Sequence, residues 1–513
     1  MISILKNADI IAGKSVNPSE DLNIPKEYNS VVIQDEKILE LGQGTELIKK
    51  YGESSELIDL SGNTIIPGLI DTHSHFLSTG FLLIGADLSE AKSVEEVLDQ
   101  VAQYVKDSNE ELLMGFNIDP GSYPVDRYPT KEELDAICKD KPMMVARRDL
   151  HSAVINSKVF ELIKIDINDP GVDKDSAGKP TGVVRRSPFS RTYEYFENNL
   201  SKEQKYEALD KAAELAISTG HTTIHALEDE ELMEIILERM SGLPVQVVPY
   251  YTDTDVSKVL KHNLPRIGGC ILSDGSFSSH TAAVAEPFAD DPGNMGVLYF
   301  TDEEMEDFIV GAHREGLQIS IHALAERAVE QLLRGFEKAQ KLYPRNDPRH
   351  RIEHYELVTP EQIRRTKELG VCVGMQPAFE YFWGGPDKMY AHYLGVERAK
   401  RTNQFRNIID AGIVIGGGSD SSVTPLDSRL GIHAAVNNPN PAQRLSPLEA
   451  IQLFTSNAAY LAFEEDKKGT ITPGKQADIA ILKENPTKIS PEKIKDIPVL
   501  GTIVKGNWVY NNL

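Results

Sequence analysis

The middle of the chain alternates short apolar runs with amphipathic helical stretches. Eight of these runs are short and rich in apolar or β-branched residues, at 64–70, 221–226, 244–248, 268–272, 318–322, 351–354, 371–374 and 413–417. Helical patterns lie between several of them, at 202–218, 302–315, 324–341 and 360–369. Such alternation is typical of parallel β/α units. Eight units predict an α/β fold with a (β/α)8 TIM-like barrel.

Strand-like segments dominate both ends of the chain. Residues 2–11, 31–33 and 37–41 carry alternating or β-branched side chains, and residues near the C-terminus have the same character, at 477–482 and 501–510. These patterns predict strands. Because two β-rich ends flank a different middle, we expect one small β-sandwich domain built from both termini, residues 1–63 and 470–513.

The stretch between the first two candidate barrel strands is too long to be a single loop. Residues 82–199 contain strand patterns of their own, at 112–116 and 143–146. A structureless loop of this length would be unusual in a compact domain. We therefore expect an inserted α+β subdomain at 82–199, over the mouth of a barrel formed by residues 64–81 and 200–469.

Composition narrows the possible partners. The 513 residues include 54 Lys and Arg against 78 Asp and Glu, which gives a net charge of −24 at pH 7, and 40% are hydrophobic. An acidic surface repels phosphate, so we expect neither nucleic acid nor a membrane as partner. A homodimer or other homo-oligomer is the base-rate expectation for the assembly.

The cysteines and the first residues bear on the compartment. Cys138, Cys270 and Cys372 are widely separated and form no CxxC pair, which argues against a disulfide scaffold and a cysteine-based zinc knuckle. Asp9 interrupts the apolar core that a signal peptide needs, and no apolar run is long enough to span a bilayer. We expect a cytoplasmic protein.

Two histidines follow the first candidate barrel strand. His73 and His75 lie two positions apart, a spacing that points both imidazoles to one side of a strand. At the carboxyl end of a barrel strand, that side can face the central pocket. Two converging neutral imidazoles favour a divalent-metal site. Two histidines on a surface loop are the alternative.

Similar polar residues close later strands. His322 ends the strand pattern 318–322, His354 ends the pattern 351–354, and Asp420 follows a glycine-rich strand. His322 alone could equally be a hydrogen-bonded core residue. Together with the earlier histidine pair, however, these residues form an ordered set at four strand ends that packing alone does not explain. The set predicts a metal site at the carboxyl end of the barrel.

The ordered set HxH, His, His, Asp resembles the ligand order of the amidohydrolase superfamily. More closely, the chain resembles amidohydrolase family 3, the branch that includes N-substituted formamide deformylases. The resemblance extends over nearly the whole chain and is carried by the segments Pro67–His75, Arg147–Ser157, Gly178–Gly182, Ser273–Ala282, Ile321–Ala323, Arg351–His354, Gly418–Asp420 and Gly469–Asp478.

The resemblance implies a metal-dependent hydrolase in which His73, His75, His322 and Asp420 bind metal. It further implies that His354 is either a second-metal ligand or a hydrogen-bonding group at the reaction centre, and that Asp420 takes the proton from the attacking water. Zinc is the expected ion, one or two per chain, although iron, manganese and nickel also suit such ligands. A bound metal ion lowers the pKa of water to about 7 and polarises the scissile bond.

One position departs from the family pattern. Relatives with two metal ions often carry a carbamylated lysine four residues before the aspartate of the Asp-Gly-Ser motif, and this chain has Cys270 there. A carbamate cannot form on cysteine. Either the site holds one metal ion without this residue, or the Cys270 thiolate is a ligand, which would suit zinc. Packing as a small buried side chain is an equally weighted alternative.

Two residues of the insertion are candidates for substrate contacts. The resemblance places the motif that contains Arg148 and His151 near the pocket. An exposed salt-bridging pair is the alternative.

Four residues of the barrel are further candidates for substrate contacts. His225 lies at the end of the pattern 221–226, where a structural hydrogen bond is equally compatible. Asp274 and His280 lie on the motif loop after the fourth candidate strand, where we expect a role in the pocket. Trp383 follows the seventh strand, and its aromatic cluster either lines an apolar substrate group or packs the loop against the barrel.

The sequence thus predicts a hydrolase of a non-peptide C–N bond, acting on a small amide or N-substituted formamide with Asp420 as general base. The alternative is a mononuclear-metal aminohydrolase that deaminates a heterocycle or an amidine-like substrate, and the missing bridging lysine fits that alternative. A catalytically silent assembly protein ranks third, because such a protein would have lost ligands that are all present here.

Overall fold

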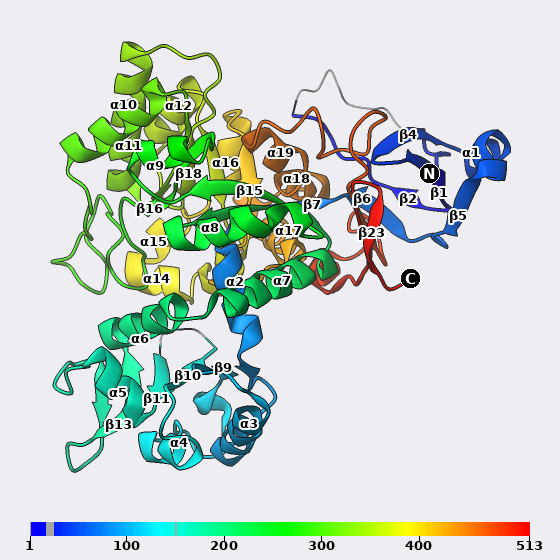
Figure 1. Cartoon of the computed structure of the whole chain (residues 1–513). Helices are drawn as coiled ribbons and strands as arrows, with labels where there is room; N and C mark the ends of the chain where they lie inside the picture. Colours follow the sequence, from blue (N-terminus) through cyan, green and yellow to red (C-terminus); the bar gives the residue numbers. More distant parts are fainter. Residues whose placement is uncertain (1, 17–24, 149, 151) are drawn as a thin grey trace. The chain divides into compact units, whose positions relative to one another are not determined.

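The computed structural model describes residues 2–16, 25–148, 150 and 152–513. Its central feature is a sheet of eight parallel strands in the order β20-β19-β18-β17-β16-β15-β14-β7 (Figure 1). The strands are β7 (Leu69–Ser74), β14 (His221–Glu228), β15 (Gln246–Tyr251), β16 (Arg266–Leu272), β17 (Gln318–Ala323), β18 (Arg351–His354), β19 (Cys372–Met375) and β20 (Ile415–Gly417). The predicted TIM-like barrel is confirmed.

The first and last barrel strands meet through the residues that follow β20. The backbone N–H of Asp420 donates to the His73 carbonyl, and that of His75 donates to Ser421, both at 2.7 Å. The buried carboxylate of Asp71 also joins the two strands, because it accepts the N–H groups of His73 and Ser419 at 2.9 and 3.0 Å. These bonds hold the ends of β7 and the β20 loop side by side.

Helices follow most barrel strands, and local sequence explains their starts. The set includes α7 (Lys202–Ser218), α8 (Glu230–Arg239), α9 (Val256–Lys261), α10 (Asp302–Arg314), α11 (Glu326–Leu342), α12 (Pro360–Glu368), α16 (Phe405–Asp410), α17 (Ser428–Val436), α18 (Pro447–Leu453) and α19 (Ser456–Leu461). Thr301 and Glu304 form a reciprocal capping box at the start of α10. Thr359 and Gln362 do the same for α12, where Pro360 occupies the first turn.

The predicted barrel strand at 64–70 is wrong in its bounds. The extended run is interrupted at Gly68. As a result, β6 (Thr64–Pro67) belongs to the terminal sheet and only β7 belongs to the barrel. The N–H of Gly68 donates to Asp478 at 2.8 Å, and a side chain at this glycine would come within 2.3 Å of Thr222. One apolar run therefore serves two sheets, and only a residue without a side chain fits between them.

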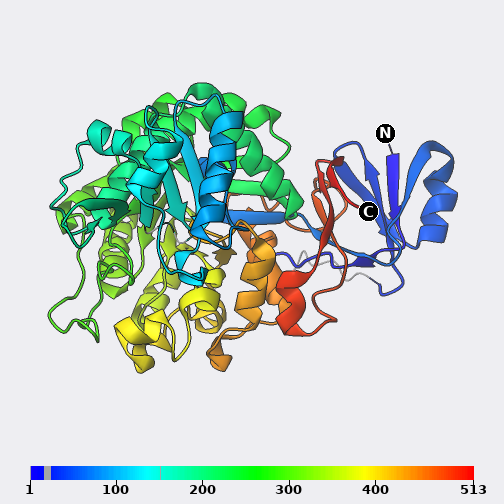
Figure 2. The same cartoon turned by 90° about the horizontal axis from the view of Figure 1, so that it is seen from below.

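Both chain ends build one β-sandwich (Figure 2). One sheet contains β1 (Ile2–Lys6), β3 (Ser30–Gln34), β4 (Lys37–Gly42) and β5 (Ser55–Asp59), and the other contains β2 (Asp9–Ile10), β6, β21 (Ile479–Leu482), β22 (Val499–Val504) and β23 (Asn507–Asn511). Side chains from both sheets, such as Val31 and Ile503, share one core. The strand expected at 501–510 is a hairpin, because Lys505 and Gly506 both have positive φ and reverse the chain.

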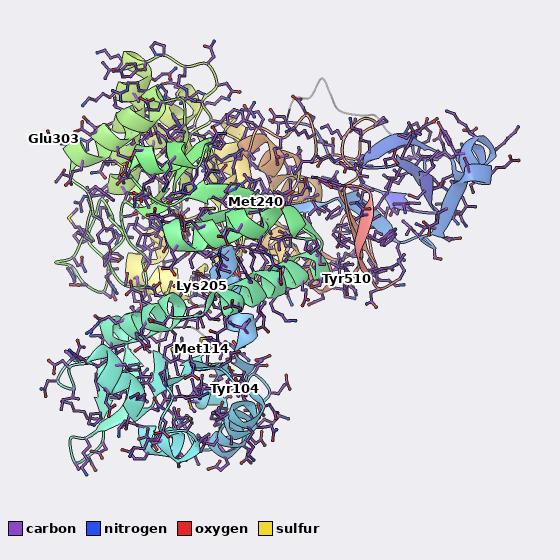
Figure 3. All side chains as sticks on the ribbon, viewed as in Figure 1. Tyr104, Met114, Lys205, Met240, Glu303 and Tyr510 are labelled. Carbon is purple, nitrogen blue, oxygen red and sulfur yellow. The ribbon has the colours of Figure 1, made fainter. Side chains whose placement is uncertain are left out.

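Residues Leu77–Ala212 form a separate compact unit. Its six-stranded mixed sheet contains β8 (Ala86–Asp87), β9 (Leu113–Ile118), β10 (Met143–Arg147), β11 (Ser152–Ile155), β12 (Val172–Lys174) and β13 (Pro180–Arg185). The accompanying helices are α2 (Phe76–Ile84), α3 (Val94–Asp107), α4 (Lys131–Ile137), α5 (Ser157–Ile163) and α6 (Arg186–Asn198). Tyr104 of α3 and Met114 of β9 lie where helix and sheet pack (Figure 3). The predicted domain bounds, and a position over the barrel mouth, stay predictions.

Among the residues that the structure describes, no helix is both long and apolar enough to cross a bilayer.

Two buried histidines, His313 and His350, form a hydrogen-bonded pair near the amino-terminal ends of β17 and β18. Ile319 donates its N–H to His350 Nδ1 at 3.1 Å, so His350 Nε2 carries the proton that it donates to His313 Nδ1 at 2.7 Å. His313 Nε2 in turn donates to the Tyr343 carbonyl at 2.7 Å. Every ring nitrogen is used in the neutral state. An added proton on either ring would therefore have no acceptor.

We expect this pair to make the protein less stable in acid. Burial, with the nearby Arg345 cation, holds the pKa of His350 well below 6.5, and burial also lowers the pKa of His313. In the unfolded chain the two histidines bind protons near pH 6.5, whereas in the folded protein they bind protons only at lower pH. The pair's contribution is therefore complete above about pH 6.5 and is lost as pH falls towards the folded-state pKa values, by up to about 1.4 kcal/mol per pH unit for each histidine.

The measurement is the free energy of unfolding by denaturant at pH 7.5 and pH 5.0. The double variant His313→Leu/His350→Phe keeps an aromatic ring against Phe336, on which His350 stacks. Its stability should fall less steeply between the two pH values than that of the wild type. Equal slopes would show that the two histidines do not titrate in this range.

Candidate metal centre

Six predicted ligand residues meet at the carboxyl end of the barrel. They come from the ends of β7, β16, β17 and β18 and from the loop after β20. Potential ligand atoms within 4.8 Å of one another form three groups: His73, His75 and Cys270; Cys270, His322 and His354; and His73, His354 and Asp420. The topology thus brings together residues that lie far apart in the chain, from His73 to Asp420.

Asp420 faces the histidine pair of β7. Its Oδ1 atom lies 3.4 Å from His73 Nε2 and 3.3 Å from His75 Nε2. In the part of the chain that the structure describes, neither His73 Nε2 nor Asp420 Oδ1 has a hydrogen-bonding partner, although both atoms are buried. Buried polar atoms are normally satisfied. Their lone pairs are therefore available to the same ligand, and a divalent cation fits both.

Cys270 lies between the β7 histidines and those of β17 and β18. Its Sγ atom is 3.9 Å from His322 Nδ1 and 3.7 Å from His354 Nε2. The ring of His354 lies between its neighbours, with ring centroids 4.9 Å from His73 and 4.4 Å from His322. The buried thiol is therefore surrounded by imidazoles rather than by apolar side chains alone.

Carbonyl groups fix two of the imidazoles. His75 Nδ1 donates to the Leu227 carbonyl at 3.1 Å, and His322 Nε2 donates to the Gly275 carbonyl at 3.2 Å. In each ring the other nitrogen is left as the acceptor and is the one that faces the cluster. Such hydrogen bonds set the tautomer of metal-binding histidines.

The electrostatics of the cluster favour the charged ligand forms. Burial opposes ionisation of the Cys270 thiol, but the imidazoles of His73, His322 and His354 outweigh burial and hold its pKa well below the usual range. Burial also opposes ionisation of Asp420. The neighbouring imidazoles, of which His73 has the largest effect, outweigh burial and hold the pKa of Asp420 well below the usual value. Thiolate and carboxylate are the forms that bind cations.

The buried carboxylate of Glu353 orients the ring of His73 by a hydrogen bond to Nδ1. Glu353 accepts the Nδ1–H of His73 at 2.8 Å and the hydroxyl of Ser320 at 2.6 Å, and its other contact is the Arg351 guanidinium at 2.8 Å. All three side chains that surround Glu353 are buried. Gly374 leaves the space, since a side chain there would come within 2.2 Å of Glu353 Oε2. Glu353 and Arg351 were not predicted from the sequence, although two charged residues in a short buried strand were a signal for them.

We expect Glu353→Gln to lower metal affinity by about 10–100-fold, because outer-sphere partners of metal-binding histidines contribute this much. The variant also leaves Arg351 as a buried charge without its carboxylate, which costs about 3–5 kcal/mol of stability. Competition with a chelator measures the first effect and denaturant unfolding the second. Ser320→Ala, which removes one hydrogen bond and no charge, is the matched control with smaller losses of both. Unchanged metal affinity in Glu353→Gln would refute the orienting role.

The structure corrects the position predicted for His225. This residue lies three positions before the end of β14, and it is fully buried rather than at the barrel rim. Its Nδ1 atom accepts from Arg351 at 3.2 Å, and its ring stacks on Tyr250 with centroids 5.6 Å apart. The strand continues beyond the pattern seen in the sequence, so His225 lies deeper in the barrel. Its observed contacts, with Arg351 and Tyr250, are with other residues of the barrel.

Asp274 and His280 are also engaged by the protein itself. Asp274 is buried and accepts the N–H groups of Ala283, Leu324 and Ala325, with Oδ1 also 3.3 Å from His322 Nε2. It therefore ties the loop after β16 to the end of β17. His280 Nε2 lies 3.0 Å from the carboxylate of Asp290. A substrate contact of either residue stays a prediction.

Three more residues were predicted to contact the substrate: Trp383, Arg148 and His151. Trp383 lies on α13 (Pro377–Trp383), with its ring 4.7 Å from that of Phe379, which stacks on His354. Arg148 belongs to the compact unit Leu77–Ala212, where it is exposed and its N–H donates to Ile118. His151 lies outside the described residues. The roles of Arg148 and His151 in substrate binding stay predictions.

A β/α barrel with histidine, cysteine and carboxylate groups converging at its carboxyl end is an architecture that can hold a divalent metal ion and activate water. Comparison with known proteins specifies the class. Residues 56–510 match the model of the amidohydrolase family, and the chain therefore belongs to this family. It is a hydrolase that acts on carbon–nitrogen bonds and depends on a divalent metal.

Individual relatives agree with this assignment. The chain is 26% identical to the putative amidohydrolase YtcJ of Bacillus subtilis over 94% of its own length and 96% of that protein. It is 22% identical to the N-substituted formamide deformylase of Arthrobacter pascens, with 94% of each chain covered. The crystal structure of an uncharacterised metal-dependent hydrolase from Pyrococcus furiosus superposes with a TM-score of 0.79 and 28% identity, covering 95% of this chain and all of the other.

Proposed function

We propose that the protein hydrolyses the C–N bond of small non-peptide amides, of the N-substituted formamide class, with two zinc ions that Cys270 would help to hold. The observation that carries this proposal is that Cys270 belongs to two groups of potential ligands, one with His73 and His75 and one with His322 and His354. A thiolate sulfur has more than one lone pair and can bind two cations. Cys270 would thus stand where relatives have a bridging carbamate.

The ligand set divides between two positions. His73, His75 and Asp420 would hold one cation together with Cys270, and His322 and His354 would hold the other. Thiolate and imidazole ligands are those that zinc prefers. Asp420 carries no hydrogen bond at Oδ1 among the described residues, so its carboxylate has lone pairs free for the chemistry.

The bound cations would polarise the amide carbonyl and lower the pKa of the attacking water to about 7. Asp420 accepts a proton from this water as its oxygen forms a bond to the carbonyl carbon, and delivers it to the nitrogen as the C–N bond breaks. The depressed pKa of Asp420 keeps its carboxylate ionised at neutral pH. For a formamide the products are formate and an amine, which accounts for every atom of substrate and water.

The resemblance to the formamide deformylase of Arthrobacter pascens supports the substrate class. The test is incubation of zinc-loaded protein with a series of N-alkylformamides, followed by assay of formate and amine in equal amounts. Amidines and amino-substituted heterocycles are assayed in parallel for ammonia. Release of ammonia from these compounds, without formate from the formamides, would overturn the proposal in favour of a deaminase.

A further inference from the structure

A short aromatic helix extends from the candidate metal centre. α13 follows β19, the strand next to the one that carries His354, and contains Phe379, Tyr381, Phe382 and Trp383. The ring of Phe379 stacks almost parallel on His354, with centroids 6.0 Å apart and an interplanar angle of 15°. The helix is thus in direct contact with a predicted ligand.

The contacts continue outward along the helix. The ring of Trp383 lies 4.7 Å from Phe379, and that of Phe382 lies 6.0 Å from Trp383. Phe379 is buried, Trp383 is half-buried, and Phe382 is 40% exposed. We call these three residues the aromatic wall. It leads from the reaction centre towards solvent.

Two other residues at the carboxyl end of the barrel are exposed and apolar. Leu272 is 49% exposed, shares a strand face with Cys270 and is the register partner of His322. Val423 is 55% exposed and donates its N–H to the Asp420 carbonyl at 2.6 Å. Both residues are therefore held next to predicted ligands, at the end of the barrel where the ligands lie. Large apolar side chains exposed around a reaction centre mark a binding surface.

The charged residue of the helix does not disturb this surface. Glu380 is buried and accepts hydrogen bonds from Thr402 at 2.6 Å and from Asn403 at 3.0 Å. The helix therefore turns its carboxylate into the protein. Lys388 contacts the ring of Tyr381, 5.7 Å from its centroid, and not that of a wall residue. The aromatic wall is consequently suited to a neutral group.

We propose that the aromatic wall, with Leu272 and Val423, binds an apolar aryl or alkyl group attached to the scissile amide. This inference rests on the proposed function, because it names the kind of substituent that the same centre accepts. Substrates would be neutral amides with a phenylalkyl or long alkyl group on nitrogen. Each buried methylene and ring adds binding free energy, so the specificity constant kcat/KM should rise with the size of that group.

Kinetics on matched formamides test the inference. We expect kcat/KM for N-(3-phenylpropyl)formamide to exceed that for N-methylformamide and for the anionic N-(3-carboxypropyl)formamide by about tenfold or more. Phe382→Ser should lower kcat/KM for the phenylpropyl compound by about tenfold, mainly through KM, and should have a much smaller effect on kcat/KM for N-methylformamide. The metal content should stay at the wild-type level. Equal kcat/KM for the three substrates would overturn the inference.

Tyr343→Ser is the matched control. Tyr343 is an aromatic residue with the same exposure, 40%, and it follows α11 at the opposite end of the barrel strands. This variant should retain wild-type kinetics on all three substrates. A loss as large as that of Phe382→Ser would mean that the effect reflects general destabilisation, and would count against the aromatic wall.

A binding measurement separates this inference from the proposed function. Trp383 and Trp508 are the two tryptophans of the chain, so Trp508→Phe leaves Trp383 as the single fluorophore. The neutral ketone 4-phenylbutan-2-one has no C–N bond to hydrolyse. It should change Trp383 fluorescence saturably, whereas acetone should not, and Phe382→Ser should weaken the response. A response without formamide hydrolysis would overturn the proposed function alone, and hydrolysis without a response would overturn this inference alone.

Discussion

Asp420→Asn is expected to abolish turnover while leaving the fold intact. The amide nitrogen and oxygen of asparagine cannot accept and return a proton at neutral pH, and general-base catalysis is worth about 10²–10⁴-fold in rate. Asp420 has φ 54°, in the left-handed region that asparagine tolerates as well as aspartate does. The backbone N–H bond to His73 does not involve the altered group. The measurement is kcat with metal-loaded protein, alongside circular dichroism and thermal unfolding.

Asp35→Asn is the control for this prediction. Asp35 also has positive φ, at 53°, and lies in the turn between β3 and β4 of the terminal sandwich. The same chemical change in the same backbone conformation should leave kcat unchanged. If Asp420→Asn kept wild-type turnover, the assignment of Asp420 as general base would be wrong.

Cys270→Ser is expected to lower the metal content by about one ion per chain or more and to reduce turnover accordingly. A serine hydroxyl ionises far less readily than a thiol whose pKa is held well below its usual value, so it cannot supply the anionic ligand. Elemental analysis of protein purified without added metal measures the stoichiometry. In cobalt-loaded protein, the same substitution should remove the sulfur-to-metal charge-transfer absorption.

Cys372→Ser separates ligation from packing. Cys372 is also buried, in β19, but burial raises its pKa to about 12 and it belongs to none of the groups of potential ligands found among the described residues. Serine there should cost stability and leave the metal content unchanged. If Cys270→Ser behaved in the same way, with full metal content, Cys270 would be a packing residue and a one-metal site, as in a deaminase, would be favoured.

Local patterns were sufficient to predict the barrel and the strand ends at which the candidate ligands lie. Helix 202–218 was predicted with its observed bounds, because amphipathic periodicity depends on the helix itself. His322 and His354 were predicted because each lies at or next to the end of its strand, and parallel strands of a barrel present that end on one side. Neither inference needed a contact between distant residues.

The errors arose where one residue depends on a distant neighbour. Gly68 divides an apolar run between two sheets because Thr222 lies against it, and nothing within residues 64–70 encodes that contact. His225 was predicted at a strand end because the strand's last two residues, Leu227 and Glu228, were not counted with it. Strand bounds depend on pairing with β7 and β15, which a single run of sequence does not contain.

The sequence by itself therefore determined the fold class, the order of the strands and the residue types that gather at the barrel's carboxyl end, because all three follow from local periodicity and chain direction. Only the tertiary structure decided that Cys270 lies next to the imidazoles of His322 and His354, and that Glu353 accepts the Nδ1–H of His73. Strand alternation says which face a side chain takes. It does not say which groups meet across the barrel, since that depends on the stagger and closure of all eight strands.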